Sequence, residues 1–187
     1  MGYLRDWKNV ISNPLNFFNN LDNNNFKKPT LFAIKTYAIA FLFSFLIMII
    51  KIFFLKSSIN NLISMFNIES FGFVMIIVAI GVMAIFIFPI TLLLTWGLLY
   101  IVAFIIHLGT RLFGSKEDFQ KTFQIYSYST APNLFAFIPY LNYILIIYSI
   151  ILLVIGIKKV HGFSTLKSIG SISILLIIIS LIIFLSL

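Results

Sequence analysis

A long uninterrupted apolar stretch dominates the pattern of the chain. Between Glu69 and Arg111 there is no Asp, Glu, Lys or Arg at 41 consecutive positions, and residues 71–106 are apolar almost throughout. About 20 helical residues cross a hydrocarbon layer about 30 Å thick, whereas this stretch would reach about 54 Å as a helix. Pro89, near its middle, lacks an amide donor and disfavours helical backbone at the residue before it. The pattern therefore predicts two spans, 71–88 and 90–108, joined by a tight hairpin at Pro89.

Three further apolar segments have the length of a membrane span: residues 31–55, 140–157 and 168–187. The first contains Lys35 and Lys51, about 24 Å apart along a helix, so each lies near an opposite border where its ammonium group reaches water. Snorkelling explains both lysines more simply than a substrate site does. Residues Lys56–Ser70 are polar enough to form a loop outside the bilayer. We therefore expect an all-α integral membrane protein, with a five-span helical bundle over residues 31–187.

Residues 123–139 differ from an ordinary span because they carry many hydroxyl and amide side chains and contain Pro132 and Pro139. Irregular backbone at membrane depth is tolerated only where protein or a water-filled cavity covers it. The segment therefore predicts a broken or re-entrant helix over residues 123–138. The candidate functional residues here are Tyr126, Ser127, Ala131, Pro132, Asn133 and Pro139. The alternative is that neighbouring helices satisfy all of these polar groups and the segment is only structural.

The first thirty residues predict a cytoplasmic amphipathic arm that precedes the membrane domain. Apolar side chains between Tyr3 and Ile11 recur at helical spacing, and Pro14 after Asn13 is typical of a helix start. Charged and amide residues interrupt the run, so it is not a signal peptide. Such an arm fits the headgroup region with Trp7 at the interface, and a packed cap on the bundle is the alternative.

The charged residues lie mainly at the ends of the apolar segments, where the borders of a membrane are expected. The chain is 61% hydrophobic and 10% charged with a net charge of +8, and its mean hydropathy is +1.10. With five spans, seven basic residues lie on the side of the N-terminus and five on the other, which favours a cytoplasmic N-terminus. The loop Lys158–Lys167 would contact anionic headgroups or would only set the orientation. Its candidate headgroup contacts are Lys158, Lys159, His161 and Lys167. Because the basic residues are scattered, no nucleic-acid partner is expected.

Few residues point to catalysis or to a cofactor. The chain has no cysteine, so disulfides and thiolate chemistry are excluded. His107 and His161 are expected on opposite sides of the membrane, hence not as a metal pair. The predicted spans contain no carboxylate, which weighs against proton-coupled transport, and the chain has no glycine-rich phosphate loop. We therefore predict no catalytic, cofactor or metal site and no enzymatic activity.

Several short motifs follow one another in an order and spacing that resemble the Yip (Ypt/Rab-interacting protein) domain family. The similarity covers the chain from about residue 10 to its end. Its motifs are Asn13-Pro14-Leu15-Asn16-Phe17-Phe18, Pro29-Thr30-Leu31-Phe32-Ala33, His107-Leu108, Leu112-Phe113-Gly114, Phe119, Thr122-Phe123, Tyr126-Ser127, Ala131-Pro132, Pro139, Gly156, His161-Gly162, Ser164 and Lys167.

The resemblance implies five spans and a cytoplasmic N-terminus, with trafficking roles and small-GTPase partners in eukaryotic members. This chain has almost no N-terminal extension, which weighs against GTPase binding. We expect a non-enzymatic membrane scaffold or lipid- and protein-interacting adaptor. A small-solute or lipid transporter with a cavity lined by the broken helix is the alternative. The expected partners are membrane lipids and a second copy or a related five-span protein. The abundance of Ile, Phe, Asn and Lys resembles an A+T-rich genome and suggests a prokaryotic plasma membrane.

Overall fold

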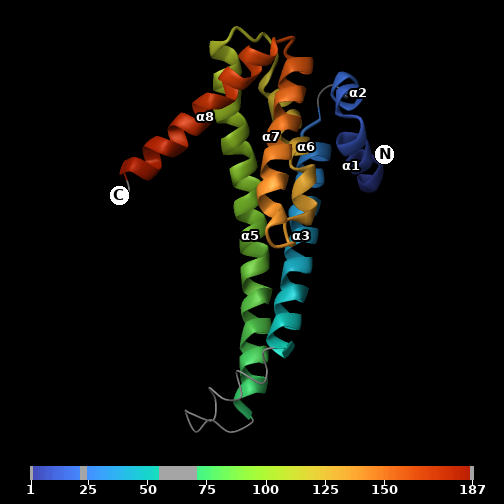
Figure 1. Ribbon diagram of the computed structural model, residues 1–187, viewed down its shortest axis with the longest axis vertical. Coiled ribbons are helices and arrows are strands. Elements are labelled where there is room, and N and C mark those ends of the chain that lie inside the picture. Colours follow the sequence, from blue (N-terminus) through green and yellow to red (C-terminus); the bar gives the residue numbers. More distant parts are fainter. Residues whose placement is uncertain (1, 22–24, 55–70, 186–187) are drawn as a thin grey trace.

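The computed structural model describes residues 2–21, 25–54 and 71–185, and these residues contain helices and no strand. This confirms the predicted all-α class. The helices are α1 (Tyr3–Ser12), α2 (Pro14–Asn19), α3 (Lys27–Phe54), α5 (Phe71–Leu112), α6 (Phe119–Ser129), the 3-10 helix η1 (Ala131–Phe135), α7 (Leu141–Val160) and α8 (Thr165–Leu185). Helices α3, α5, α6 and α7 run along one long axis, whereas α8 leaves it obliquely and α1 and α2 lie beside it (Figure 1).

Helices α3 and α5 lie antiparallel and form the long axis of the molecule (Figure 1). Near one end, the ring centroid of Phe26 lies 6.2 Å from that of Tyr100. Further along the pair, the centroid of Phe41 lies 5.1 Å from that of Phe88. Helix α5 has 42 residues, which corresponds to about 63 Å of regular helix. It is therefore longer than one bilayer crossing requires, as its sequence indicates.

The predicted hairpin at Pro89 is wrong, because α5 continues through this proline without a break. Proline removes one backbone donor, but hydroxyl side chains and neighbouring helices can satisfy backbone groups in an apolar helix. Next to the proline, Thr91 Oγ1 donates a hydrogen bond of 2.8 Å to the Phe88 carbonyl, and Phe88 packs on α3. The two predicted spans 71–88 and 90–108 are therefore parts of one helix. The five-span count that depended on their separation is not confirmed.

The chain reverses direction between α6 and α7. Helix α6 leads from the end where α5 finishes towards the middle of the molecule, η1 turns the chain, and α7 returns to the same end (Figure 1). The ring centroid of Phe137 lies 5.0 Å from that of Phe43, so the turn lies beside the middle of α3. Tyr140, the residue before α7, has a left-handed backbone with φ 66°. A helix break therefore lies within the segment where Pro132 and Pro139 predicted one.

The N-terminal helices α1 and α2 pack against the bundle as a cap. Trp7 Nε1 donates a hydrogen bond of 2.8 Å to the Ala131 carbonyl of η1. Tyr148 of α7 donates its hydroxyl proton to the Ile11 carbonyl over 2.7 Å. Val10 and Phe18 are buried, and α2 begins at Pro14 with Asn13 as its N-cap. The apolar faces of both helices are thus used for packing, the second of the two placements considered for this arm.

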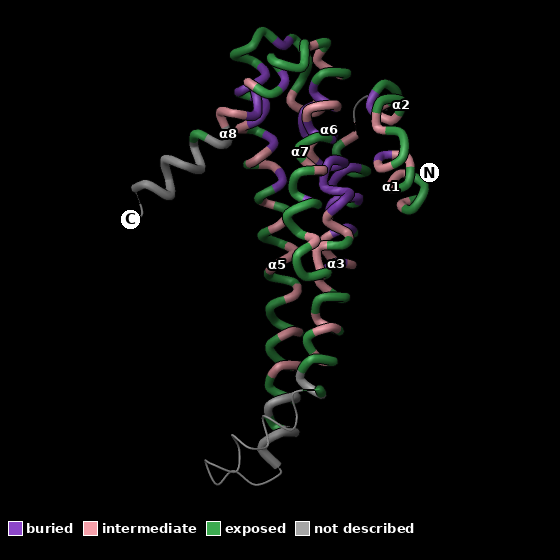
Figure 2. Tube along the Cα trace, in the orientation of Figure 1, coloured by how far each residue is buried: buried purple, intermediate pink, exposed green. Residues whose placement is uncertain are grey.

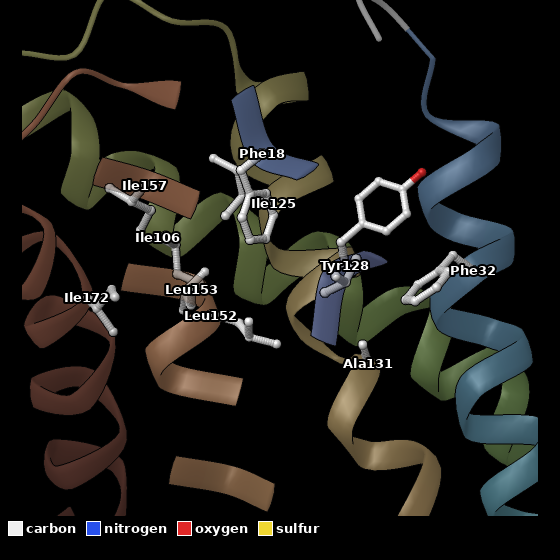
Figure 3. Packing of buried hydrophobic residues seen from close by; sticks show 11 residues of the cluster. Phe18, Phe32, Ile106, Ile125, Tyr128, Ala131, Leu152, Leu153, Ile157 and Ile172 are labelled. Atoms are coloured by element: carbon white, nitrogen blue, oxygen red, sulfur yellow. The ribbon is translucent and has the colours of Figure 1, made fainter. Parts of the chain in front are cut away.

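Buried residues gather in the half of the molecule that contains α6, α7 and the cap, while the far halves of α3 and α5 are largely exposed (Figure 2). Figure 3 shows the main core, in which Phe18 of α2 and Ile125 of α6 meet side chains of α7. Gly156 of α7 permits this contact, because a β-carbon there would clash with Ile125 and press on Phe18. A glycine at this position therefore sets how closely α7 approaches α2 and α6.

Three of the described helices are long and apolar enough to cross a membrane: Lys27–Lys51, Val78–Leu112 and Leu141–Val160. Their exposed surface consists of large apolar side chains such as Phe54, Ile85 and Tyr143. An aqueous environment would leave this surface unburied at a high cost, whereas lipid would not. The predicted loop Lys56–Ser70 lies outside the described residues.

Candidate functional site

The structure places most of the predicted candidate segment inside the bundle. Ser127, Ala131 and Pro132 are buried, Tyr126 and Asn133 are partly buried, and Pro139 is exposed. Ser129 Oγ and Thr130 Oγ1 each donate a hydrogen bond of 2.7 Å to a backbone carbonyl within the same turn.

Asn133 is the link between the break and its neighbours. Its Nδ2 donates to the Tyr37 hydroxyl of α3 over 3.1 Å, and its Oδ1 accepts a weak bond of 3.5 Å from Ser149 Oγ of α7. Much of the polarity that made this segment unusual in the sequence is therefore satisfied by adjacent helices. Within the described residues, the buried Ser127 Oγ has no hydrogen-bond partner.

The side of the turn that faces away from the core forms an open notch. It has a volume of about 490 Å³ and lies between the middle of α3 and the first turns of α7. Its polar members are Ser44, Tyr140, Asn142 and Tyr143, and its other members are Ala136, Phe137, Ile138, Pro139 and Ile146. Of the predicted candidates, Pro139 alone lines this notch. The sequence signal for the missed residues is weak, since Ser44 and Asn142 are single polar residues within apolar runs.

An apolar groove on the adjacent surface is continuous with this notch at Ser44. The groove has a volume of about 360 Å³ and lies between α3 and α5. Apart from Ser44, it is lined by Phe41, Phe45, Met48, Ile80, Met83, Ala84 and Ile87. A hollow with several polar groups and an apolar groove thus share Ser44 on the outer surface of α3, α5 and α7.

A second polar cluster joins His107 and His161, which the sequence placed on opposite sides of a membrane. That expectation is wrong, because α6 leads back into the bundle and α7 returns to the end where α5 finishes (Figure 1). Thr122 Oγ1 of α6 lies 3.0 Å from His107 Nδ1 and 3.3 Å from His161 Nε2. Ser115 Oγ lies 2.6 Å from His161 Nδ1. Residues up to 54 positions apart in the chain therefore meet around one hydroxyl group.

Arg111 and burial determine the electrostatics of this cluster. Arg111 Nε donates to His107 Nε2 over 3.3 Å, and the guanidinium also donates to the Ser115 carbonyl over 3.4 Å. Burial, together with the smaller effects of the nearby His107 and Arg111, lowers the pKa of His161 to about 4. His161 is therefore neutral at physiological pH. Within the described residues, no group of three or more His, Cys, Asp or Glu side chains could hold a metal ion.

The remaining predicted headgroup contacts lie around the same end of the molecule. Lys158 Nζ donates to Thr165 Oγ1 over 3.0 Å, and Lys167 is exposed on the first turn of α8. Lys159 lines a hollow of about 400 Å³ with Lys121 and Glu117, beside α2. Lys121 follows the third of the five predicted spans and Lys159 follows the fourth, which would put them on opposite sides of the membrane, but the structure places them together.

The comparisons with known proteins give one family. A model of the Yip1 domain matches residues 8–187, which is nearly the whole chain. No curated protein and no solved structure matches this chain. The match includes His107, Thr122 and His161, three of the residues that carried the resemblance in the sequence.

Proposed function

The chain belongs to the Yip1 domain family, and we propose that it acts as a non-enzymatic membrane adaptor that binds a transmembrane helix of a partner protein. Family membership together with the apolar helices makes it a membrane-embedded protein. The observation that carries the proposal is that the apolar groove shares Ser44 with a notch that holds hydroxyl and amide groups. This shared surface lies on the outer face of helices that are otherwise covered with large apolar side chains.

The notch is the part of this surface that lipid tails would cover least well. The hydroxyl and amide groups of Ser44, Asn142 and Tyr143 find no hydrogen-bond partner among hydrocarbon chains, and an unsatisfied polar group there costs free energy. A helix with a polar side chain at mid-span would satisfy them, and its apolar residues would fill the groove. The partner is therefore expected to have one polar residue within an apolar span.

The packed interior supports an adaptor over the alternative of a small-solute or lipid transporter. Phe123, Ile125, Leu152 and Ile157 are fully buried between α6, α7 and their neighbours. These side chains occupy the region where a transport cavity lined by the broken helix would lie. The notch and the groove are open hollows on the outer surface instead, as expected of a binding surface.

The distribution of charge supports an orientation for the adaptor. The end formed by the links 113–118 and 161–164 carries six basic residues and two acidic ones, whereas Lys51 lies near the opposite end of α3. Basic residues accumulate on the cytoplasmic side of membrane proteins. We therefore place this end in the cytoplasm, with the α6–α7 turn entering the membrane from that side. The six basic residues are Arg111, Lys116, Lys121, Lys158, Lys159 and Lys167.

Site-specific photo-crosslinking in native membranes tests the proposed surface. A photoreactive phenylalanine analogue replaces Tyr143 in the notch or, as control, Leu93, which is similarly exposed on α5. We expect Tyr143 to give a discrete protein adduct, from a second copy or from another protein, and Leu93 to react with lipid alone. The double variant Ser44→Leu with Asn142→Leu should lose that adduct. Lipid adducts alone at Tyr143 would contradict the proposal.

A further inference from the structure

We propose that His161, Ser115, Thr122 and His107 form a proton-sensitive clasp that holds the α5–α6 link against the α7–α8 link. His161 lies just after α7 and contacts a different segment through each ring nitrogen. Its Nδ1 lies 2.6 Å from Ser115 Oγ in the α5–α6 link, and its Nε2 lies 3.3 Å from Thr122 Oγ1 of α6. Through Thr122 the contact extends to His107 of α5. The partner surface described above lies elsewhere, so this inference does not depend on it.

The donors around Ser115 indicate which nitrogen of His161 carries the proton. The Glu117 amide donates to Ser115 Oγ over 3.1 Å, so the serine hydroxyl proton is available for His161 Nδ1. Nδ1 then accepts, and the Nε2–H donates to Thr122 Oγ1. One neutral tautomer of His161 therefore satisfies both of its contacts.

The hydrogen-bond partners of His107 define its tautomer in the same way. Arg111 Nε–H donates to His107 Nε2, which leaves Nδ1 as the protonated nitrogen that donates to Thr122 Oγ1. The threonine oxygen has two lone pairs and accepts from both imidazoles. Both rings thus reach Thr122 Oγ1 in the neutral form, each in a defined tautomer.

Protonation of His161 turns Nδ1 from an acceptor into a donor and so reverses the shortest contact. Nδ1 becomes a donor and faces Ser115 Oγ, whose own proton must then turn away. The new positive charge lies beside Arg111, which already approaches the cluster from α5. Burial lowers the pKa of His161 to about 4 in the closed clasp, whereas an exposed histidine titrates near 6.5. As the pH falls, His161 therefore binds a proton at a higher pH in the open form than in the closed form, and this favours the open form.

The other charged groups around the cluster have partners of their own or lie away from His161. Lys121 of α6 directs its ammonium to the Leu21 carbonyl, and Lys158 of α7 bonds with Thr165. On the link, Asp118 acts on His107, and Glu117 contributes its backbone amide to Ser115. Lys167 on the first turn of α8 is exposed. Arg111 is therefore the charged side chain that acts directly on His161, in the direction that opposes its protonation.

A distance measurement by electron spin resonance tests the clasp, because the chain has no cysteine and spin labels can be placed at will. One label replaces exposed Lys116 in the α5–α6 link, and the other replaces exposed Leu166 at the start of α8. The full-length protein in lipid nanodiscs is measured from pH 7.5 to pH 4. We expect one narrow distance distribution at pH 7.5, and a second, longer distance whose population grows as the pH falls below about 6.5.

The variant His161→Gln keeps a polar side chain that does not titrate in this range, so its distribution should change with pH less than that of the wild type. Thr122→Val removes the shared oxygen and should give the longer distance already at pH 7.5. A label pair at the exposed Leu46 and Leu93, on α3 and α5 away from the clasp, should give the same distance at every pH. An unchanged wild-type distribution down to pH 4, or an equal response in His161→Gln, would overturn the proposal. The wild-type series decides it even where a variant does not fold.

Discussion

The α-carbon of Gly109 in α5 lies directly against the backbone carbonyl of Ser171 in α8. A β-carbon built on Gly109 would overlap this carbonyl oxygen, and the obstacle is backbone rather than a flexible side chain. The two helices therefore meet backbone to backbone at this point, close to the link that His161 begins. Small residues permit such close approaches between apolar helices.

Replacing Gly109 with alanine should consequently separate α8 from α5. We expect Gly109→Ala to lower the free energy of unfolding by about 1–3 kcal/mol, the usual range for overpacking. Thermal unfolding in detergent measures the change. Gly97→Ala is the matched control on the same helix, because a β-carbon at Gly97 meets nothing within 4 Å. The control should leave stability unchanged or raise it by up to about 1 kcal/mol. Equal losses in both variants would argue against this helix contact.

The strained backbone at Tyr140 gives a second test. This residue has φ 66°, a left-handed conformation that costs a side-chain-bearing residue about 1–2 kcal/mol. Tyr140→Gly should therefore keep or raise the free energy of unfolding, by up to about 1 kcal/mol, in the same thermal assay. Tyr143→Gly, within the first turn of α7, should lower it by about 1 kcal/mol instead. If both glycine variants lose stability equally, the turn does not require this conformation.

Reagent accessibility distinguishes an unbroken α5 from a hairpin at Pro89. Single cysteines at Phe88 and Thr91 lie in the middle of a continuous apolar helix, so they should resist a membrane-impermeant thiol reagent from either side. A cysteine at Lys116 should react from the cytoplasmic side alone. Labelling is read by mass shift on intact cells and on inverted vesicles. Reaction at Phe88 or Thr91 from one side would restore the hairpin.

Stability should also depend on pH through His161. Its pKa is about 4 in the folded protein and near 6.5 in an unfolded chain. As the pH falls below 6.5 the unfolded state binds a proton that the folded state does not, so folding is favoured less. The contribution of neutral His161 to the free energy of unfolding is therefore complete above about pH 6.5. It declines as the pH falls towards 4 and is constant below that pH. Unfolding temperatures between pH 7.5 and 4 measure this, and the decline should be smaller in His161→Gln.

The sequence by itself determined the membrane class, the helical architecture and the family. These depend on local properties, since apolar runs require lipid and helix starts follow from neighbouring residues, as at Asn13 and Pro14. The break near Pro132 and Pro139 was also readable, because two prolines and several polar groups interrupt one apolar run. In contrast, the sequence did not show whether the helix continues through Pro89. Pro89 leaves the carbonyl of Ile85, one turn earlier, without its amide donor. Whether the helix continues past such a gap depends on the packing around it, and here Phe88 packs on Phe41 of α3 beside the proline.

Only the tertiary structure decided which distant polar residues meet. His107 and His161 come together because α5 runs unbroken to one end of the molecule and the turn beside Phe43 sends α7 back to that same end. The notch at Ser44 and Asn142 likewise exists because the turn stops halfway along α3. Hydropathy along a chain records how much each segment prefers lipid, and it contains no information on where a helix ends against another. Because α6 leads back into the bundle and α7 returns to the end where α5 finishes, Arg111, Lys116 and Lys121 lie at the same end as Lys158 and Lys159 (Figure 1).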